Sequence, residues 1–162
     1  MGDVYNSLLN KNMNKNLNNE KKQKILTFAM AGQEYGIDIN YITTIIENEY
    51  PITRVPGAPK FIKGVINLRG DIVTIMELRH KLKLPSIEDT NETKIIVVNF
   101  EEIALGIKVD QVDEVVEILA NSIEAITDIS DKDISQYFSG LCKLNKRVII
   151  LLNIENIIKK DC

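Results

Sequence analysis

The stretch Gly64–Leu82, GVINLRGDIVTIMELRHKL, contains two short apolar runs separated by a sharp break. With the residues just before it, this stretch predicts a strand from Ile62 to Leu68 and a second from Ile72 to Met76, because short apolar runs next to glycine are typical of strands. The break at Arg69-Gly70-Asp71 predicts a tight turn, since Gly70 adopts a positive φ at low cost. The charged segment Glu77–Leu84 that follows is a candidate helix.

Composition limits the classes of protein to consider. The chain has 162 residues, 44% of them hydrophobic, a formal net charge of −3 and a pI of about 5.3. This length allows one ordinary domain or two small ones, and the acidic balance argues against binding a nucleic-acid backbone. Cys142 and Cys162 form no disulfide framework, which predicts a reducing compartment. No apolar run approaches the roughly 18 residues of a membrane span, and no signal-peptide core is present.

Residues 1–23 differ in composition from the rest of the chain. Asparagine and lysine dominate, and the few apolar residues follow neither a helical nor a strand period. Such a segment cannot bury enough apolar surface to offset the entropy lost on ordering. The sequence therefore predicts a flexible tail here.

A series of short apolar segments follows the tail. Strands are expected at Ile25–Met30 and Tyr35–Ile39 around a turn at Ala31–Glu34, because the apolar residues alternate or cluster over short runs. The segment Asn40–Ile46 is ambiguous and suits a helical turn leading into a strand. Proline and glycine predict a loop at Glu49–Lys60. Residues 85–92 are expected to form a polar connector.

The chain also repeats its own pattern. At an offset of 70 residues, Ile25–Phe28 aligns with Ile95–Val98, Tyr35–Asn40 with Leu105–Asp110, and Ile42 with Val112; at an offset of 76, Gly64 aligns with Gly140. We therefore expect two β-rich halves, about 25–88 and 93–152, each with roughly five short strands. Small barrels suit this spacing, and halves this small should share a buried interface. The pattern leaves open an exchange of terminal strands. A C-terminal helix is expected at 154–160.

The sequence has no pattern typical of a catalytic or metal site. His80 is the only histidine and has no cysteine nearby, which argues against a metal site. Phosphate-binding loops and nucleophile-elbow motifs are absent. The chain is therefore expected not to be an enzyme. A hydrolase would need a cleft that pairs His80 with a buried carboxylate, and a nucleic-acid-binding barrel would need exposed aromatics in a basic groove, whereas Phe28 and Phe100 lie in apolar strands.

A surface for protein partners is the remaining class. The proline-rich loop presents Val55 and Ala58 beside the hairpin, and three of the four arginines, at positions 54, 69 and 79, lie in or near the opening stretch. Arginine is enriched at binding hot spots because its planar fork and apolar stem both contribute. The alternative is that these arginines only keep the surface soluble, with Arg69 a solvated turn residue.

Several motifs carry a specific resemblance. EYGIDINYITTII, FIKGVINLRGDIVTIMELRHKL, ALGIKVDQVDEVVEI and FSGLCKLNKRVIILLNIENII, in this order, resemble the CheW family of bacterial chemotaxis coupling proteins. The resemblance covers residues 24–160. It implies a mainly all-β fold of two intertwined five-stranded SH3-like barrels with short helices. It also implies a non-catalytic scaffold that needs no cofactor.

The resemblance further implies partners and site residues. CheW proteins connect the cytoplasmic tips of chemoreceptors to the regulatory domain of the histidine kinase CheA, in arrays beneath the membrane. Receptor contact in the family implies Arg69 in the NLRG motif, Ile42, Val112 and the position of Thr44, where the family often has an acid. The kinase-contact residues stay unassigned. The adaptor half of a receiver-fused protein and a free-standing kinase regulatory domain are related alternatives, and a small-barrel nucleic-acid binder is the alternative from another class.

Overall fold

The computed structural model describes residues 21–127 and 129–161, so residues 1–20 of the expected tail lie outside the described part. The first half contains β1 (Lys22–Met30), β2 (Gln33–Asp38), the 3₁₀ turn η1 (Ile39–Tyr41), β3 (Ile42–Glu47), β4 (Ile62–Leu68), β5 (Asp71–Glu77) and α2 (Leu78–Lys81). The second contains β6 (Lys94–Phe100), β7 (Ile103–Val109), β8 (Gln111–Leu119), η2 (Ala120–Ser122), β9 (Ile123–Glu124), α3 (Lys132–Ser135), β10 (Phe138–Leu144), β11 (Arg147–Leu152) and α4 (Ile154–Asp161).

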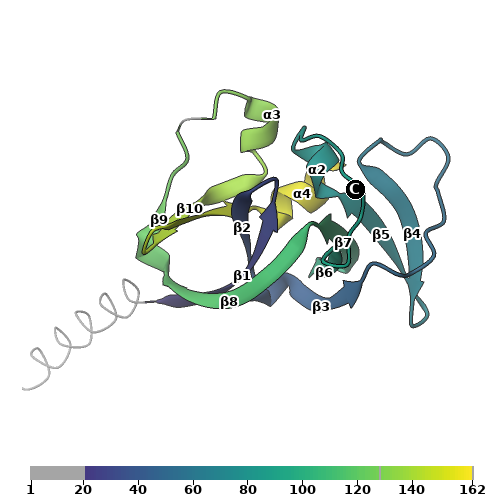
Figure 1. Ribbon diagram of the computed structural model, residues 1–162, viewed down its shortest axis with the longest axis horizontal. Coiled ribbons are helices and arrows are strands. Elements are labelled where there is room, and N and C mark those ends of the chain that lie inside the picture. Colours follow the sequence, from purple (N-terminus) through teal and green to yellow (C-terminus); the bar gives the residue numbers. More distant parts are fainter. Residues whose placement is uncertain (1–20, 128, 162) are drawn as a thin grey trace, which may run out of the picture.

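The strands form two sheets that each draw on both halves of the sequence (Figure 1). The first sheet has the order β8-β1-β2-β11-β10-β9, and the second has the order β3-β6-β7-β5-β4. All neighbouring pairs are antiparallel except β2–β11 and β5–β7, where a strand of one half meets a strand of the other in parallel. The expected mainly all-β fold of two intertwined barrels is thus confirmed, with the two-residue β9 as a sixth strand of the first sheet.

The internal repeat of the sequence is also a repeat of the structure. The hairpin β1–β2 corresponds to β6–β7, and β4–β5 corresponds to β10–β11. The pairing of Ile42 with Val98 in the second sheet matches that of Val112 with Phe28 in the first. An approximate two-fold relation therefore links the two sheets, and each position in one sheet has a counterpart for comparison in the other.

The expected elements are present, with shifts at their ends. Lys22 and Gln23 belong to β1 and not to the expected tail, because they pair with Leu119 and Ile118 of β8. The first turn contains only Ala31 and Gly32, since Gln33 already pairs with Met30 in the β1–β2 ladder. The ambiguous segment forms η1 followed by β3. The helix expected at residues 77–84 is a single turn, α2.

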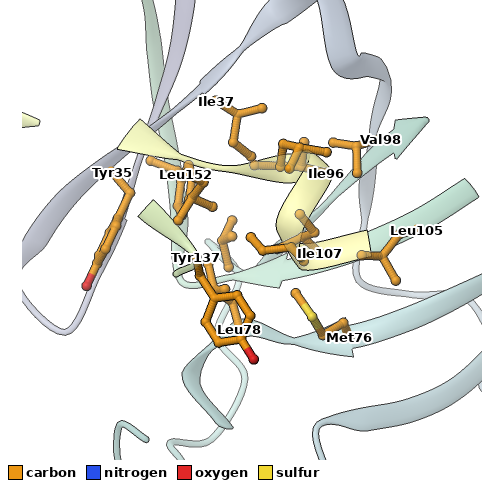
Figure 2. Packing of buried hydrophobic residues seen from close by; sticks show 14 of the residues in the cluster. Tyr35, Ile37, Met76, Leu78, Ile96, Val98, Leu105, Ile107, Tyr137 and Leu152 are labelled. Atoms are coloured by element: carbon orange, nitrogen blue, oxygen red, sulfur yellow. The ribbon is translucent and has the colours of Figure 1, made fainter. Parts of the chain in front are cut away.

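The largest hydrophobic cluster lies between the two sheets and joins them (Figure 2). Tyr35, Ile37 and Leu152 come from the first sheet, and Ile96 and Ile107 come from the second. The helices α2 and α4 lie between the sheets in Figure 1 and contribute to the same cluster. Each sheet has in addition a smaller cluster of its own. Most of the core is therefore shared between the barrels.

A buried ion pair also joins the barrels. Arg79 of α2 donates hydrogen bonds from Nε and Nη2 to the two carboxylate oxygens of Asp110, at 2.8 and 2.6 Å, and from Nη1 to the carbonyl of Pro85 at 2.7 Å. Asp110 lies between β7 and β8, where the chain passes from the second sheet to the first. Its carboxylate also accepts the backbone N–H of Ala31 in the β1–β2 turn, at 3.0 Å. Such a bidentate, charge-assisted arrangement fixes the orientation of the two side chains as well as the distance between them.

Gly64 occupies a bulge in β4, at the position where the register with β5 shifts. Its φ is +146°, and an added Cβ would lie 2.8 Å from Cγ2 of Ile52 and closer still to the carbonyl oxygen of Thr53. Thr53 forms an isolated two-hydrogen-bond bridge to Val65, so the backbone of the loop is held against this glycine. Gly140 has the same conformation at the equivalent bulge in β10.

We expect Gly64→Ala to lower the free energy of unfolding by about 2 to 3 kcal/mol, because the Cβ forces the Thr53 bridge away from β4. Gly57→Ala is the matched control, since Gly57 also has a positive φ, of +79°, but no atom lies within 4 Å of its added Cβ. Only the backbone cost of about 1 kcal/mol is expected there. Urea unfolding measures both, and equal losses would show that the close approach of Thr53 is unimportant.

Candidate functional site

Arg69 occupies the tip of the two-residue turn between β4 and β5. Both Arg69 and Gly70 have positive φ, at 54° and 92°, and the turn is closed by a hydrogen bond from Gly70 N–H to Asn67 Oδ1 at 2.9 Å. A left-handed conformation is unfavourable for arginine and more tolerable for asparagine. The equivalent position in the β10–β11 turn is Asn145, with φ of 58°. The backbone therefore gives no reason for an arginine at this tip.

Arg69 shares a surface pocket with Thr44. The pocket has a volume of about 340 Å³ and is called here the Arg69 pocket; it is lined by Thr43, Thr44, Ile46, Leu68, Arg69 and Asp71. It joins β3, at one edge of the second sheet, to the β4–β5 turn at the other edge. Arg69 is exposed, and within the described ranges its side chain has no hydrogen bond or ion pair. Its donors are available to a partner.

Ile42 and Val112 lie outside this pocket. Both are half-buried, and both pack at the border of the cluster shared by the two sheets. Ile42 begins β3, two residues before Thr44, whereas Val112 occupies the counterpart position near the start of β8. The structure thus brings two of the four expected receptor-contact residues, Thr44 and Arg69, into one pocket. It places the other two at equivalent points on the barrel junction.

Asp71 is the charged residue among the pocket residues that sequence reasoning missed. It is exposed and follows the turn directly, so that a carboxylate and a guanidinium line the same pocket. The repeat offers a signal for it, because the counterpart of Asp71 in the β10–β11 hairpin is Arg147. Charge is thus present after both turns, but with opposite sign.

The counterpart region in the first sheet is closed by ion pairs. Arg147 donates from Nε to Glu34 at 3.0 Å and from Nη1 to Glu114 at 2.8 Å, and Nη2 contacts Glu34 as well. Glu114 is the counterpart of Thr44. The hydrogen bonds that Arg147 donates to Glu34 raise the pKa of the Arg147 guanidinium above its usual range. The same location is therefore filled by internal pairs in one barrel and open in the other.

Pocket size does not distinguish the site. A larger pocket, of about 490 Å³, lies at the start of β1 and contains none of the four expected residues. A pocket of about 400 Å³ near α2 contains His80, Glu77 and Ser86. Glu77 is buried, but its carboxylate pairs with Lys63 at 3.0 Å, and in the part of the chain that the structure covers, the His80 side chain makes no hydrogen bond. Among the described residues, His80 and Glu77 therefore do not form the hydrogen-bonded pair that a hydrolase of this kind would need.

Two further findings concern metals and membranes. Over residues 21–127 and 129–161, no group of three or more histidine, cysteine, aspartate or glutamate side chains is placed to hold a metal ion. Across the same residues, no helix has both the length and the apolar character needed to cross a bilayer.

These features define a class: a double-barrel β protein with an open surface pocket lined by an exposed arginine that is unpaired among the described residues. The model of the CheW-like domain matches residues 24–162. The chain therefore belongs to the CheW family.

Individual relatives agree with this placement. The chemotaxis protein CheW of Klebsiella aerogenes is 36% identical over 139 residues, covering 86% of this chain and 83% of the relative. The chemotaxis protein CheW of Thermotoga maritima is 34% identical, and the match covers 86% of this chain and 90% of the relative. Among solved structures, the scaffolding protein TtCheW from Thermoanaerobacter tengcongensis matches with a TM-score of 0.75 and 31% identity over 81% of this chain and 88% of that one. The chain is a chemotaxis scaffold protein, not an enzyme.

Proposed function

We propose that this protein couples the cytoplasmic tips of chemoreceptors to the histidine kinase CheA, in arrays beneath the membrane. In this proposal Arg69 and Thr44 contact the receptor in the Arg69 pocket, and Ile42 and Val112 supply apolar contacts beside it. The kinase binds elsewhere on the barrels, through residues that stay unassigned. No chemical step is required of the protein.

The single observation that carries the receptor site is the unpaired Arg69 in an open pocket. The internal repeat serves as a control, because a requirement of the barrel fold should appear in both halves. The counterpart turn has Asn145 at its tip, and the counterpart of Thr44 is engaged by Arg147. Of the two sheets, the second alone has an exposed arginine beside an open pocket. Binding of a partner explains this difference better than a requirement of folding does.

The chemistry of the pocket suits an amphipathic helix. Apolar side chains of a receptor helix would pack against Ile46 and Leu68, as helices do in apolar grooves. Arg69 would donate hydrogen bonds to a carbonyl or carboxylate on that helix, and Asp71 would favour a nearby cation. Affinities near micromolar, about −8 kcal/mol, are sufficient, because repetition in an array raises the local concentration. Signals would pass as shifts in how receptor, scaffold and kinase pack.

We expect Arg69→Ala to weaken binding of a purified chemoreceptor cytoplasmic fragment by roughly 1 to 2 kcal/mol, about 5- to 30-fold, because a hot-spot arginine is lost. Binding of purified CheA should be unchanged, and so should the free energy of unfolding. Isothermal titration calorimetry with the full chain measures both affinities.

Lys146→Ala is the matched control, since Lys146 is an exposed cation in the equivalent β10–β11 turn. It should bind the receptor fragment as the parent does. Equal receptor affinity of Arg69→Ala and its parent would remove the pocket from the proposal. Failure of the parent to bind either partner would remove the coupling function itself.

A further inference from the structure

A second pocket carries a concentration of positive charge that the proposed receptor site does not use. It lies between the proline-rich loop and α2, has a volume of about 400 Å³, and is called here the basic pocket. Arg54, Lys60, Lys63 and His80 line it, with Val55 and Pro59 among its apolar residues. The net charge of the whole chain is −3, so the positive charge of this pocket is opposite in sign to the net charge of the chain.

Three side chains of the basic pocket are available for binding. Arg54, Lys60 and His80 are exposed, and among the residues that the structure describes their side chains form no ion pair or hydrogen bond. The pocket contains one carboxylate, that of Glu77, which is 8% exposed and already pairs with Lys63 at 3.0 Å. An incoming anion would therefore meet two uncompensated cations, Arg54 and Lys60, with the His80 side chain beside them.

The loop that forms one wall is held in place before any partner arrives. Thr53 bonds Val65 of β4 in both directions, at 2.9 and 2.8 Å, and the turn closed by Ala58 N–H on the Val55 carbonyl follows it. Prolines at 51, 56 and 59 restrict the remaining backbone. A preorganised wall lowers the entropy lost on binding.

The second half of the chain shows that the barrel does not need these charges. At the repeat offset of 76, Lys63, Glu77 and His80 correspond to Ser139, Asn153 and Asn156. Both asparagines form hydrogen bonds within the protein. Asn153 Oδ1 accepts the backbone N–H of Asn156 at the start of α4, at 2.9 Å, and the Asn156 side-chain amide donates to the Gln136 carbonyl. The charged set therefore belongs to the first half alone.

We infer that the basic pocket docks an acidic protein segment, with two or more carboxylates reaching the cations and an apolar side chain against Val55 and Pro59. Separated carboxylates suit this pocket better than a compact phosphate, because the basic side chains come from three different segments, the loop, β4 and α2, and the buried Glu77 repels concentrated negative charge. The site is distinct from the Arg69 pocket. Lys63 lies near the start of β4 and Arg69 directly follows its end, roughly 20 Å apart along the strand, so both pockets can be occupied together.

The test uses the full ¹⁵N-labelled chain and a capped peptide, Glu-Leu-Glu-Ala-Glu, followed by two-dimensional NMR in about 50 mM salt. Amide shifts are expected at Val55, Ala58, Lys60 and His80, and the affinity should fall at high salt. The double variant Arg54→Gln/Lys60→Gln should bind at least fivefold more weakly. Lys146→Gln, which removes an exposed charge from the far hairpin, should leave the affinity unchanged.

Three outcomes would overturn the inference. The first is an absence of shifts at the basic pocket, and the second is equal binding of the matched peptide in which glutamine replaces glutamate. The third is inorganic phosphate producing the same shifts as strongly as the peptide, which would indicate a simple anion site. None of these measurements involves a receptor or a kinase, so the result is independent of the proposed coupling function.

Discussion

Arg79→Leu should lower the free energy of unfolding by about 3 kcal/mol, the largest loss that we expect from any single polar substitution in this chain. The variant leaves the Asp110 carboxylate in place without its bidentate partner. Removing one member of a buried pair typically costs about 3 to 5 kcal/mol, since the other charge stays desolvated. We expect the lower end of this range because the Asp110 side chain is 22% exposed and keeps the Ala31 N–H. Urea unfolding at pH 7 measures the loss.

Arg147→Leu is the control, because it also removes an arginine that bridges strands. The Arg147 side chain is 34% exposed, against 10% for Arg79, so water screens its pairs. A loss of about 1 kcal/mol is expected for so exposed a group. Losses of equal size would mean that burial of the Arg79–Asp110 pair does not set its importance.

The pH dependence provides an independent signature of the same pair. Burial is the largest single influence on the pKa of the Asp110 carboxyl and raises it, but the hydrogen bonds from Arg79 and Ala31, together with the charges of Arg79 and Lys108, outweigh it, so the pKa lies below its usual value of 3.8. The pair's stabilisation is thus fully present above about pH 4 and declines as the pH falls through the lowered folded-state pKa. Without Arg79, its hydrogen bonds and its charge no longer lower the pKa of Asp110, so this pKa is higher in the variant than in the parent. The stability gap between parent and variant should therefore narrow from pH 7 to pH 3, and a constant gap would contradict this account.

Dividing the chain in the connector should abolish folding of both pieces. We expect the fragments 1–87 and 88–162 to be unfolded alone and to regain cooperative unfolding when mixed. In the first fragment, β1 and β2 lack their pairing partners β8 and β11. In the same fragment, β3 and β5 lack their pairing partners β6 and β7. Each fragment would also expose its part of the shared core, and such a loss exceeds the few kcal/mol by which small domains are stable.

Circular dichroism and NMR of the separate and mixed fragments measure this effect. The mixture is the internal control, because it shows that the break itself is compatible with the fold. Native-like spectra from either fragment alone would contradict a shared core and would mean that the sequence halves are independent units.

Local features of the fold could be predicted from sequence, whereas strand partners could not. Ile62–Leu68 is found as expected because its apolar residues and the following Gly70 act over a few positions. The repeat also located Gly140 as the counterpart of Gly64. The parallel pairing of β2 with β11 has no local signal, since Tyr35 and Ile150 are partners across most of the chain. Lys22 lies in the segment predicted to be a tail, because its partner, Leu119, is also far away in the sequence.

The candidate site, too, could be predicted only in part, because it joins residues that are far apart in the sequence. The expected contribution of Arg69, Thr44, Ile42 and Val112 came from resemblance to a family, and the shared pocket of Thr44 and Arg69 depends on two opposite edges of a sheet coming together. The basic pocket was also not predictable as a unit. Its charged side chains come from the loop, from β4 and from α2, and the repeat alone showed which of them the fold can do without.

The exchange of strands between the sheets has a consequence for synthesis on the ribosome. The second sheet has all of its strands once Val109 has been made, but the first cannot close until β11, ending at Leu152, emerges from the exit tunnel. The strands translated first, β1 and β2, can pair with each other at once. Their other partners, β8 and β11, are made much later. During that interval Leu26, Phe28 and Ile37, all buried in the finished protein, are exposed to solvent. The nascent chain is thus a natural client for chaperones that hold exposed apolar segments.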